Sequence, residues 1–255
     1  MVTLSACIEM LFTDMPFIDR IDAAAAAGAP AVEFWGADGK DVSAIFRRAE
    51  ALGLRVGTFA CGVPLTDPAK GERAEAGMRQ AIATAAEHGL RDVIVTTGNR
   101  VPELVPAEQE ASVVRGLRAV AATAEAAHVR LNLEILNTLV DHKGYFLDRT
   151  ETAVRIVEAV ASDAVKVLYD IYHVQIMEGN LIATIRANIG HIGYFHAADV
   201  PGRFEPGTGE INYRNVIAAI EDAGYDGFVG LEFRPKGGAG RSGDALRSAI
   251  AAIRT

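Results

Sequence analysis

Short apolar segments alternate with longer segments of helical period along the whole chain. The apolar segments are rich in Val, Ile, Leu and Phe, as buried parallel strands are. We expect eight strands, at residues 4–8, 31–35, 55–59, 92–96, 130–135, 165–169, 191–196 and 227–233. Alanine-rich stretches with apolar residues every three or four positions predict helices at residues 16–27, 42–52, 71–88, 107–127, 151–160, 179–189, 212–223 and 243–253.

Glycines mark the ends of four predicted helices. Gly28, Gly53, Gly89 and Gly224 each follow a helical run, where a glycine that ends the helix is favoured. Eight strand–helix units within 255 residues, with no linker-like stretch, predict a single (β/α)8 TIM barrel over residues 1–255. The alternative is a doubly wound open sheet. It is disfavoured because the first strand–helix turn, SACIEMLF, has no glycine and so no dinucleotide-binding fingerprint.

Composition narrows the class of protein. Half of the residues are apolar and 23% are charged, which is ordinary for a globular chain. The net charge of −8 disfavours a nucleic-acid binder, because such proteins need clustered Lys and Arg. No apolar run approaches the roughly 18 residues of a membrane span, and the first residues do not resemble a signal peptide. We therefore expect a cytoplasmic protein that binds neither nucleic acid nor membrane.

Groups that can bind a metal stand at the ends of the last four predicted strands: Glu134, Asp170, His196 and Glu232. In a barrel these strand ends meet on one face. A single carboxylate there could simply cap the following loop, but several buried together would repel one another unless a cation compensates them. Three carboxylates and one imidazole are hard ligands that favour Mn²⁺, Mg²⁺ or Co²⁺. The sequence therefore predicts one divalent metal ion at this face.

Two further residues lie near these strand ends. His173 follows Asp170 by three residues, and Arg203 lies in the loop HAADVPGRFEPGTGEINY after the seventh strand. A histidine and an arginine beside a metal suit hydrogen bonding to hydroxyl groups or a carboxylate of a substrate. The alternative for His173 is a structural loop histidine. For Glu33, the sequence leaves open whether it faces the barrel mouth or starts a loop.

Over essentially its whole length the chain resembles the xylose-isomerase-like sugar isomerase and epimerase barrels, and the hydroxypyruvate isomerases in particular. The resemblance is strongest in ADVPGRFEPGTGEINY and GYDGFVGLEFRP, and the opening MLFTDMPFIDRIDAAAAAGAPAVEF also fits. It implies a metal held by Glu134, Asp170, His196 and Glu232, with the two glutamates also moving a proton.

The sequence departs from both nearest groups of that superfamily. Hydroxypyruvate isomerases often carry Gln where this chain has His196. Ketose 3-epimerases carry His there and match His173 through DxxH, but this chain lacks their substrate-binding Glu near Val140.

The resemblance implies a metal-dependent aldose–ketose isomerase of a small hydroxy-carbonyl substrate. The leading reaction is hydroxypyruvate to tartronate semialdehyde, through an enediolate. The alternatives are a ketose 3-epimerase of the tagatose or psicose type, a dehydratase of the inosose type, and a non-catalytic sugar-binding barrel. An endonuclease-IV-like nuclease is disfavoured, because its multi-zinc cluster needs several His ligands. Related barrels commonly associate, so a homo-oligomer is expected.

Overall fold

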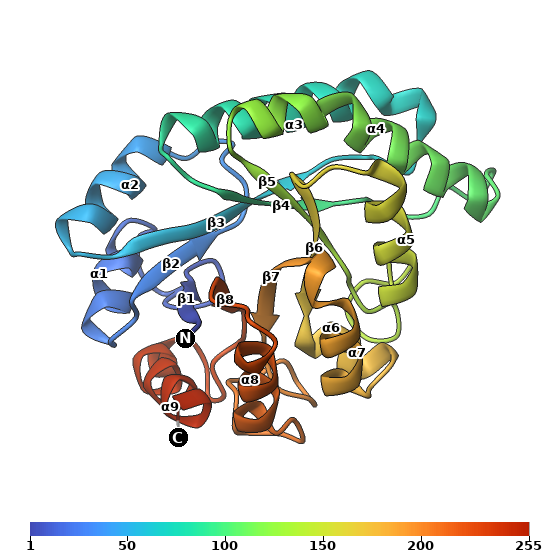
Figure 1. The fold of residues 1–255 in the computed structure, drawn as a ribbon. Helices are drawn as coiled ribbons and strands as arrows, with labels where there is room; N and C mark the ends of the chain where they lie inside the picture. Colours follow the sequence, from blue (N-terminus) through green and yellow to red (C-terminus); the bar gives the residue numbers. More distant parts are fainter. Residues whose placement is uncertain (255) are drawn as a thin grey trace.

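Eight parallel strands pair in chain order and close into a barrel in the computed structural model, which describes residues 1–254 (Figure 1). The barrel closes where β1 pairs with β8, with Leu4 opposite Val229. The strands are β1 Thr3–Cys7, β2 Ala31–Phe34, β3 Arg55–Gly62, β4 Asp92–Thr96, β5 Arg130–Glu134, β6 Val165–Asp170, β7 Ile192–Ala197 and β8 Phe228–Leu231. The predicted TIM barrel is confirmed.

Helices cover the outside of the barrel (Figure 1). They are α1 Asp19–Ala26, α2 Val42–Ala51, α3 Gly71–Glu87, α4 Pro106–Ala126, α5 Thr150–Val160, α6 Ile171–Met177, α7 Leu181–Asn188, α8 Tyr213–Asp222 and α9 Ser242–Arg254. Short 3₁₀ turns are η1 Pro68–Lys70, η2 Ile189–His191 and η3 Ala239–Arg241. Apolar side chains fill the space between strands and helices, and burying one Leu or Phe there contributes about 1.5–3 kcal/mol.

Every predicted strand and helix is present, with ends displaced by a few residues. Gly28, Gly53, Gly89 and Gly224 follow their helices with φ of 89°, 70°, 64° and 88°, the left-handed conformation that glycine adopts without strain. One helix was not predicted. The sequence places His173 in a loop, whereas it lies in the first turn of α6.

The start of α6 is fixed by Asp170. Its side chain caps the helix, because Oδ1 accepts hydrogen bonds from the backbone N–H groups of Tyr172 (2.8 Å) and His173 (3.1 Å). This cap holds Asp170 and His173 at one point of the barrel mouth. The helix is too short to show a clear helical period in the sequence.

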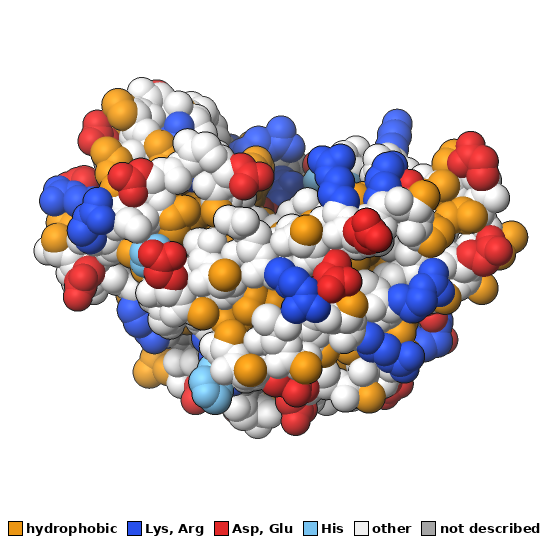
Figure 2. Space-filling view, turned by 90° about the horizontal axis from the view of Figure 1, so that it is seen from above, with side chains coloured by type: hydrophobic (Ala, Val, Ile, Leu, Met, Phe, Trp, Pro, Cys, Tyr) orange, Lys and Arg blue, Asp and Glu red, His pale blue; other side chains and the backbone are white. Residues whose placement is uncertain are grey.

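Acidic and basic side chains are interspersed over one face of the molecule (Figure 2). No continuous basic stripe crosses the face shown. Within residues 1–254, no helix is both long and apolar enough to cross a membrane.

Candidate metal centre and active site

The structure brings the four predicted ligands together at the carboxyl ends of the strands. Glu134 ends β5, Asp170 ends β6, His196 is next to last in β7, and Glu232 follows β8. Each offers one ligand atom, and these atoms all lie within 4.8 Å of one another. All four side chains are buried, the most exposed being Glu134 at 6%. Neighbouring parallel strands end at one edge, which is why residues far apart in sequence converge here.

Imidazole nitrogen Nδ1 of His196 faces the three carboxylates. It lies 3.3 Å from Glu134 Oε1, 3.5 Å from Glu232 Oε2 and 3.9 Å from Asp170 Oδ2. The atom is fully buried and makes no well-aligned hydrogen bond. A buried nitrogen left without a partner among carboxylate oxygens is the arrangement that a metal ion would complete.

Charge at this point also fits a divalent cation. Four buried carboxylates surround one imidazole and one guanidinium, so negative charge exceeds positive by two when all four carboxylates are ionised and both bases are protonated. The carboxylates are Glu33, Glu134, Asp170 and Glu232, and the bases are His196 and Arg203. Burial raises the pKa of Asp170 to about 7, although His196 and Arg203 act to lower it. A dication such as Mn²⁺, Mg²⁺ or Co²⁺ would neutralise this excess.

Glu232 is held by donors from two other loops. Trp35 Nε1 donates a hydrogen bond to Glu232 Oε1 (2.7 Å), and Arg203 forms a close ion pair with Oε2. Burial opposes ionisation, but Arg203 and His196 together hold the pKa of Glu232 well below its usual range. Glu232 is therefore a carboxylate in this arrangement.

Arg203 is positioned by a loop that folds around one buried aspartate. Asp199 accepts backbone hydrogen bonds from Val200 and Ile211 on one oxygen, and from Gly207 and Gly209 on the other, at 2.9–3.1 Å. A Cβ on Gly209 would lie 2.1 Å from the carbonyl oxygen of Val200, so only glycine permits this turn. Arg203 itself has φ +57°, and its Nε is buried without a partner.

His173 is held by Asn137 in one tautomer. The amide oxygen of Asn137 accepts the backbone N–H groups of Val140 and Asp141 (2.9 Å each), which fixes the orientation of the amide. Its Nδ2 then donates to His173 Nδ1 (2.6 Å) and to Asp141 Oδ2 (2.7 Å). Burial and the charge of Arg203 hold the pKa of His173 well below its ordinary value. The ring is therefore neutral with its hydrogen on Nε2, which lies 3.6 Å from Asp170 Oδ2.

Sequence reasoning missed several residues of this site. Asn137 and Asp141 lie in an irregular loop, where no periodicity signals their position. Trp35, which follows β2, contacts Glu232 after β8, two strands away around the barrel. The sequence does not decide whether Glu33 faces the barrel mouth, and the structure places it inside the barrel, 3.1 Å from His196 Nε2. The sequence feature that indicates a role for Glu33 is its position in the apolar strand AVEF, because a carboxylate buried there needs a charged or hydrogen-bonding partner.

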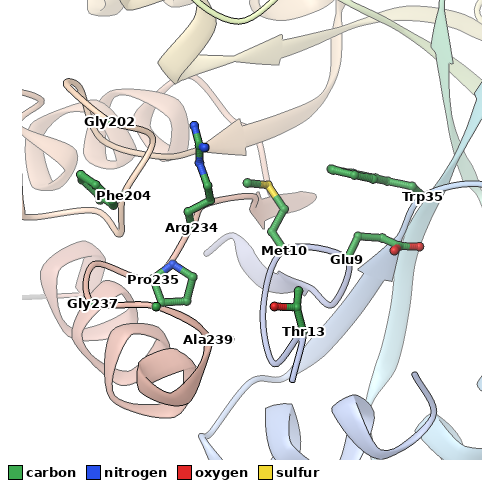
Figure 3. A pocket seen from close by; sticks show the side chains of 11 residues that line it. Glu9, Met10, Thr13, Trp35, Gly202, Phe204, Arg234, Pro235, Gly237 and Ala239 are labelled. Atoms are coloured by element: carbon green, nitrogen blue, oxygen red, sulfur yellow. The ribbon is translucent and has the colours of Figure 1, made fainter. Parts of the chain in front are cut away.

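A cavity of about 610 Å³ lies beside Trp35, the side chain that donates to Glu232 (Figure 3). Figure 3 shows Arg234 between Phe204 on one side and Met10 and Trp35 on the other. Trp35 links the cavity to the cluster through its bond to Glu232. Its lining also includes Glu9 and Thr13 but none of the four cluster residues, so the cavity lies next to the cluster rather than around it.

Comparison with known proteins agrees with this geometry. Residues 21–255 match the family described as xylose isomerase-like TIM barrel. The chain belongs to this family. The resemblance predicted from the sequence is therefore confirmed.

Individual members of the family are similar over nearly their full length. A 2-oxo-tetronate isomerase of Cupriavidus necator is 34% identical over 254 residues, covering 93% of this chain and 95% of that protein. The hydroxypyruvate isomerase of Escherichia coli K12 is 32% identical over 248 residues, covering 92% and 95%. A solved structure described as an AP endonuclease, family 2, from Brucella melitensis has a TM-score of 0.88 at 27% identity, covering 98% and 99%.

Proposed function

We propose that this family member is a metal-dependent isomerase that interconverts the aldose and ketose forms of a small hydroxy-carbonyl acid. Hydroxypyruvate to tartronate semialdehyde is the leading reaction. The observation that carries the proposal is the buried cluster in which Glu134 and Glu232 share one centre with Asp170 and His196, beside the guanidinium of Arg203. The names of the two relatives above support the same class of substrate.

Glu134, Asp170, His196 and Glu232 would hold the metal ion. When bound, a divalent cation supplies a Lewis acid that polarises a carbonyl group and acidifies the neighbouring C–H bond.

The two glutamates move the proton. One carboxylate takes a proton from C3 of hydroxypyruvate, which leaves an enediolate, and the other returns a proton to C2. The hydroxyl proton on O3 passes to O2, so that C3 becomes the aldehyde and C2 carries the new hydroxyl group. Glu232 is ionised in the resting site through its pairing with Arg203, as a base for this step must be. Acid–base catalysis of this kind contributes about 10²–10⁴-fold.

Arg203 and His173 orient the substrate. The buried Nε of Arg203 has no partner, so it is free to donate to a substrate carboxylate while the other end of the guanidinium contacts Glu232. His173 presents an Nε2–H that can donate to a substrate hydroxyl group. Both side chains are buried, so these donors act in a water-poor setting where each hydrogen bond is stronger.

Two further candidates rest on the name of one relative and on two residues of the site. A four-carbon 2-oxo acid, of the kind named for the Cupriavidus relative, could undergo the same proton transfer. A free ketose could be epimerised at C3, a reaction for which His196 and His173 provide the residue types of the ketose epimerases.

One experiment separates isomerisation of hydroxypyruvate from epimerisation of a ketose. The metal-loaded protein is incubated in D₂O with hydroxypyruvate and, separately, with ketoses, and NMR identifies the products and the position of deuterium. Isomerisation predicts tartronate semialdehyde with deuterium at C2, appearing faster than spontaneous exchange. Deuterium at C3 of an epimerised ketose, with hydroxypyruvate untouched, would contradict the proposal.

A further inference from the structure

A carboxylate outside the four-residue cluster contacts His196 on the side of the ring opposite the cluster. Glu33 lies on β2, with its Oε1 3.1 Å from His196 Nε2, a close contact that is not aligned as a hydrogen bond. The two side chains are 2% and 1% exposed. The opposite ring nitrogen, Nδ1, faces Glu134, Asp170 and Glu232. The imidazole therefore lies between one carboxylate on its Nε2 side and three on its Nδ1 side.

Glu33 is itself fixed in place. Tyr194, on β7 and fully buried, donates its hydroxyl hydrogen to Glu33 Oε2 at 2.7 Å. This leaves Oε1 directed at the imidazole. A chain of contacts thus runs through the barrel interior from Tyr194 to Glu33 to His196.

Two glycines make room for this chain. A Cβ on Gly230 of β8 would lie 2.2 Å from Glu33 Oε1 and 2.6 Å from His196 Cδ2. A Cβ on Gly57 of β3 would lie 2.5 Å from the hydroxyl of Tyr194. A larger residue at either position would displace Tyr194, Glu33 or His196. Glycines on β3 and β8 therefore leave the space that these three side chains occupy.

We infer that Glu33 is a positioning residue that keeps hydrogen on Nε2 of His196 and thereby directs Nδ1 to the metal ion. The inference rests on the metal site of the proposed function. A metal-binding histidine usually donates the N–H of its second ring nitrogen to a carboxylate. This hydrogen bond fixes the tautomer of the ring and makes the metal-binding nitrogen more basic. A glutamate buried only for stability would be a poor choice, because replacing a buried ion pair by apolar groups is often neutral or stabilising.

The experiment measures metal binding rather than turnover. Mn²⁺ is titrated into chelator-treated protein, and free Mn²⁺ is followed by its EPR signal, for wild type, Glu33→Gln, Glu33→Ala and Tyr194→Phe. Loss of such a partner commonly costs about 10- to 100-fold in affinity. We expect Glu33→Ala to lose this much, Glu33→Gln less because its amide oxygen still accepts from Nε2, and Tyr194→Phe least.

The matched control is Glu205→Gln. Glu205 is a buried glutamate of the same barrel mouth whose carboxylate accepts the backbone N–H of Lys236 and forms no ion pair with His196. We expect it to bind Mn²⁺ as the wild type does. A second readout is ¹⁵N NMR of the His196 ring in metal-loaded protein with a diamagnetic Mg²⁺ ion, where hydrogen on Nε2 is expected in the wild type.

The outcomes distinguish failure of the Glu33 inference from failure of the proposed metal site. Wild-type affinity in both folded Glu33→Gln and Tyr194→Phe would overturn the role of Glu33 and leave the metal site intact. Hydrogen on Nδ1 in the NMR spectrum would overturn the role of Glu33 and also remove His196 from the proposed ligands, because a protonated Nδ1 has no lone pair for a metal ion. If the wild type itself bound no divalent ion, the proposed metal site would fail together with this inference. If Glu33→Ala does not fold, Glu33→Gln and Tyr194→Phe carry the test.

Discussion

The guanidinium of Arg203 is ion-paired with the carboxylate of Glu232 at the mouth of the barrel. The group proposed to recognise a substrate carboxylate therefore also holds one of the two proposed bases. Trp35 holds the other oxygen of the same carboxylate from β2's side of the mouth. In the proposed mechanism, binding and proton transfer are thus joined through these two side chains, and a substrate carboxylate would share Arg203 with Glu232.

This coupling predicts the effect of Arg203→Ala. We expect kcat/KM to fall about 10- to 100-fold more for hydroxypyruvate than for neutral dihydroxyacetone, because a charged hydrogen bond is worth about 1.5–3 kcal/mol. Steady-state kinetics with both substrates measure this ratio. The exposed Arg115→Ala is the control, and it should change neither value. Equal losses for the two substrates would remove the physical support for an acid substrate.

Neutralising either proposed base should abolish turnover while preserving the fold. Glu134→Gln and Glu232→Gln keep the size of each side chain but cannot accept a proton, so we expect kcat to fall by about 10²–10⁴-fold or more. The exposed Glu103→Gln should retain full activity. Circular dichroism checks folding, and Mn²⁺ titration separates a lost base from a lost ligand. Substantial activity in either variant would eliminate the scheme with two bases.

Ionised Asp170 should lower the free energy of unfolding of the metal-free protein at high pH. Its folded pKa of about 7 exceeds the ordinary value of 3.8, so the stability that it contributes at low pH is lost as pH rises to 7. Asp170→Asn keeps the helix cap without the charge. We expect metal-free Asp170→Asn to be more stable than wild type at pH 8, by on the order of 1–4 kcal/mol, with the difference shrinking toward pH 4.

Urea denaturation in the presence of a chelator, from pH 5 to pH 8, measures this difference. Added Mn²⁺ should stabilise the wild type much more than the variant, because only a state that binds metal gains from it. A constant difference across this pH range would show that Asp170 carries no such buried charge.

Asn137 should set the tautomer of His173. Asn137→Asp replaces the donor at Nδ1 by an acceptor, so the ring hydrogen should move from Nε2 to Nδ1. Two-dimensional ¹H–¹⁵N spectra of the ring report the position directly. We expect kcat/KM to fall about 2- to 10-fold or more, the value of one neutral hydrogen bond. Asn188→Asp on α7 is a matched control outside the mouth. An Nδ1–H ring in the wild type would refute the assignment.

The strand ends were predictable because one rule places them. Parallel strands of a barrel all end on the same face, so Glu134, Asp170, His196 and Glu232 could be grouped from the sequence before any distance was known. The barrel itself was predictable from the alternation of apolar segments and helical stretches, because few other topologies accommodate that order. Their roles as ligands and bases stay predictions that the variants above test.

Other parts of the site depend on contacts that no local pattern carries. Glu33 and His196 are 163 positions apart and meet only because β1 and β8 pair and bring β2 near β7 across the barrel. Asn137 acts through backbone hydrogen bonds of an irregular loop, whose conformation has no sequence period. His173 was expected in a loop, since a helix as short as α6 is recognisable only once Asp170 is known to cap it.

The most direct test of the central claim follows hydroxypyruvate by ¹H NMR, first with protein stripped of metal by a chelator and then after addition of Mn²⁺. We expect hydroxypyruvate to stay unchanged with the stripped protein, and Mn²⁺ to start its conversion to tartronate semialdehyde, seen as the aldehyde or its hydrate. Equal conversion by verified metal-free protein, or no conversion of hydroxypyruvate by the Mn²⁺-loaded protein, would contradict the central claim.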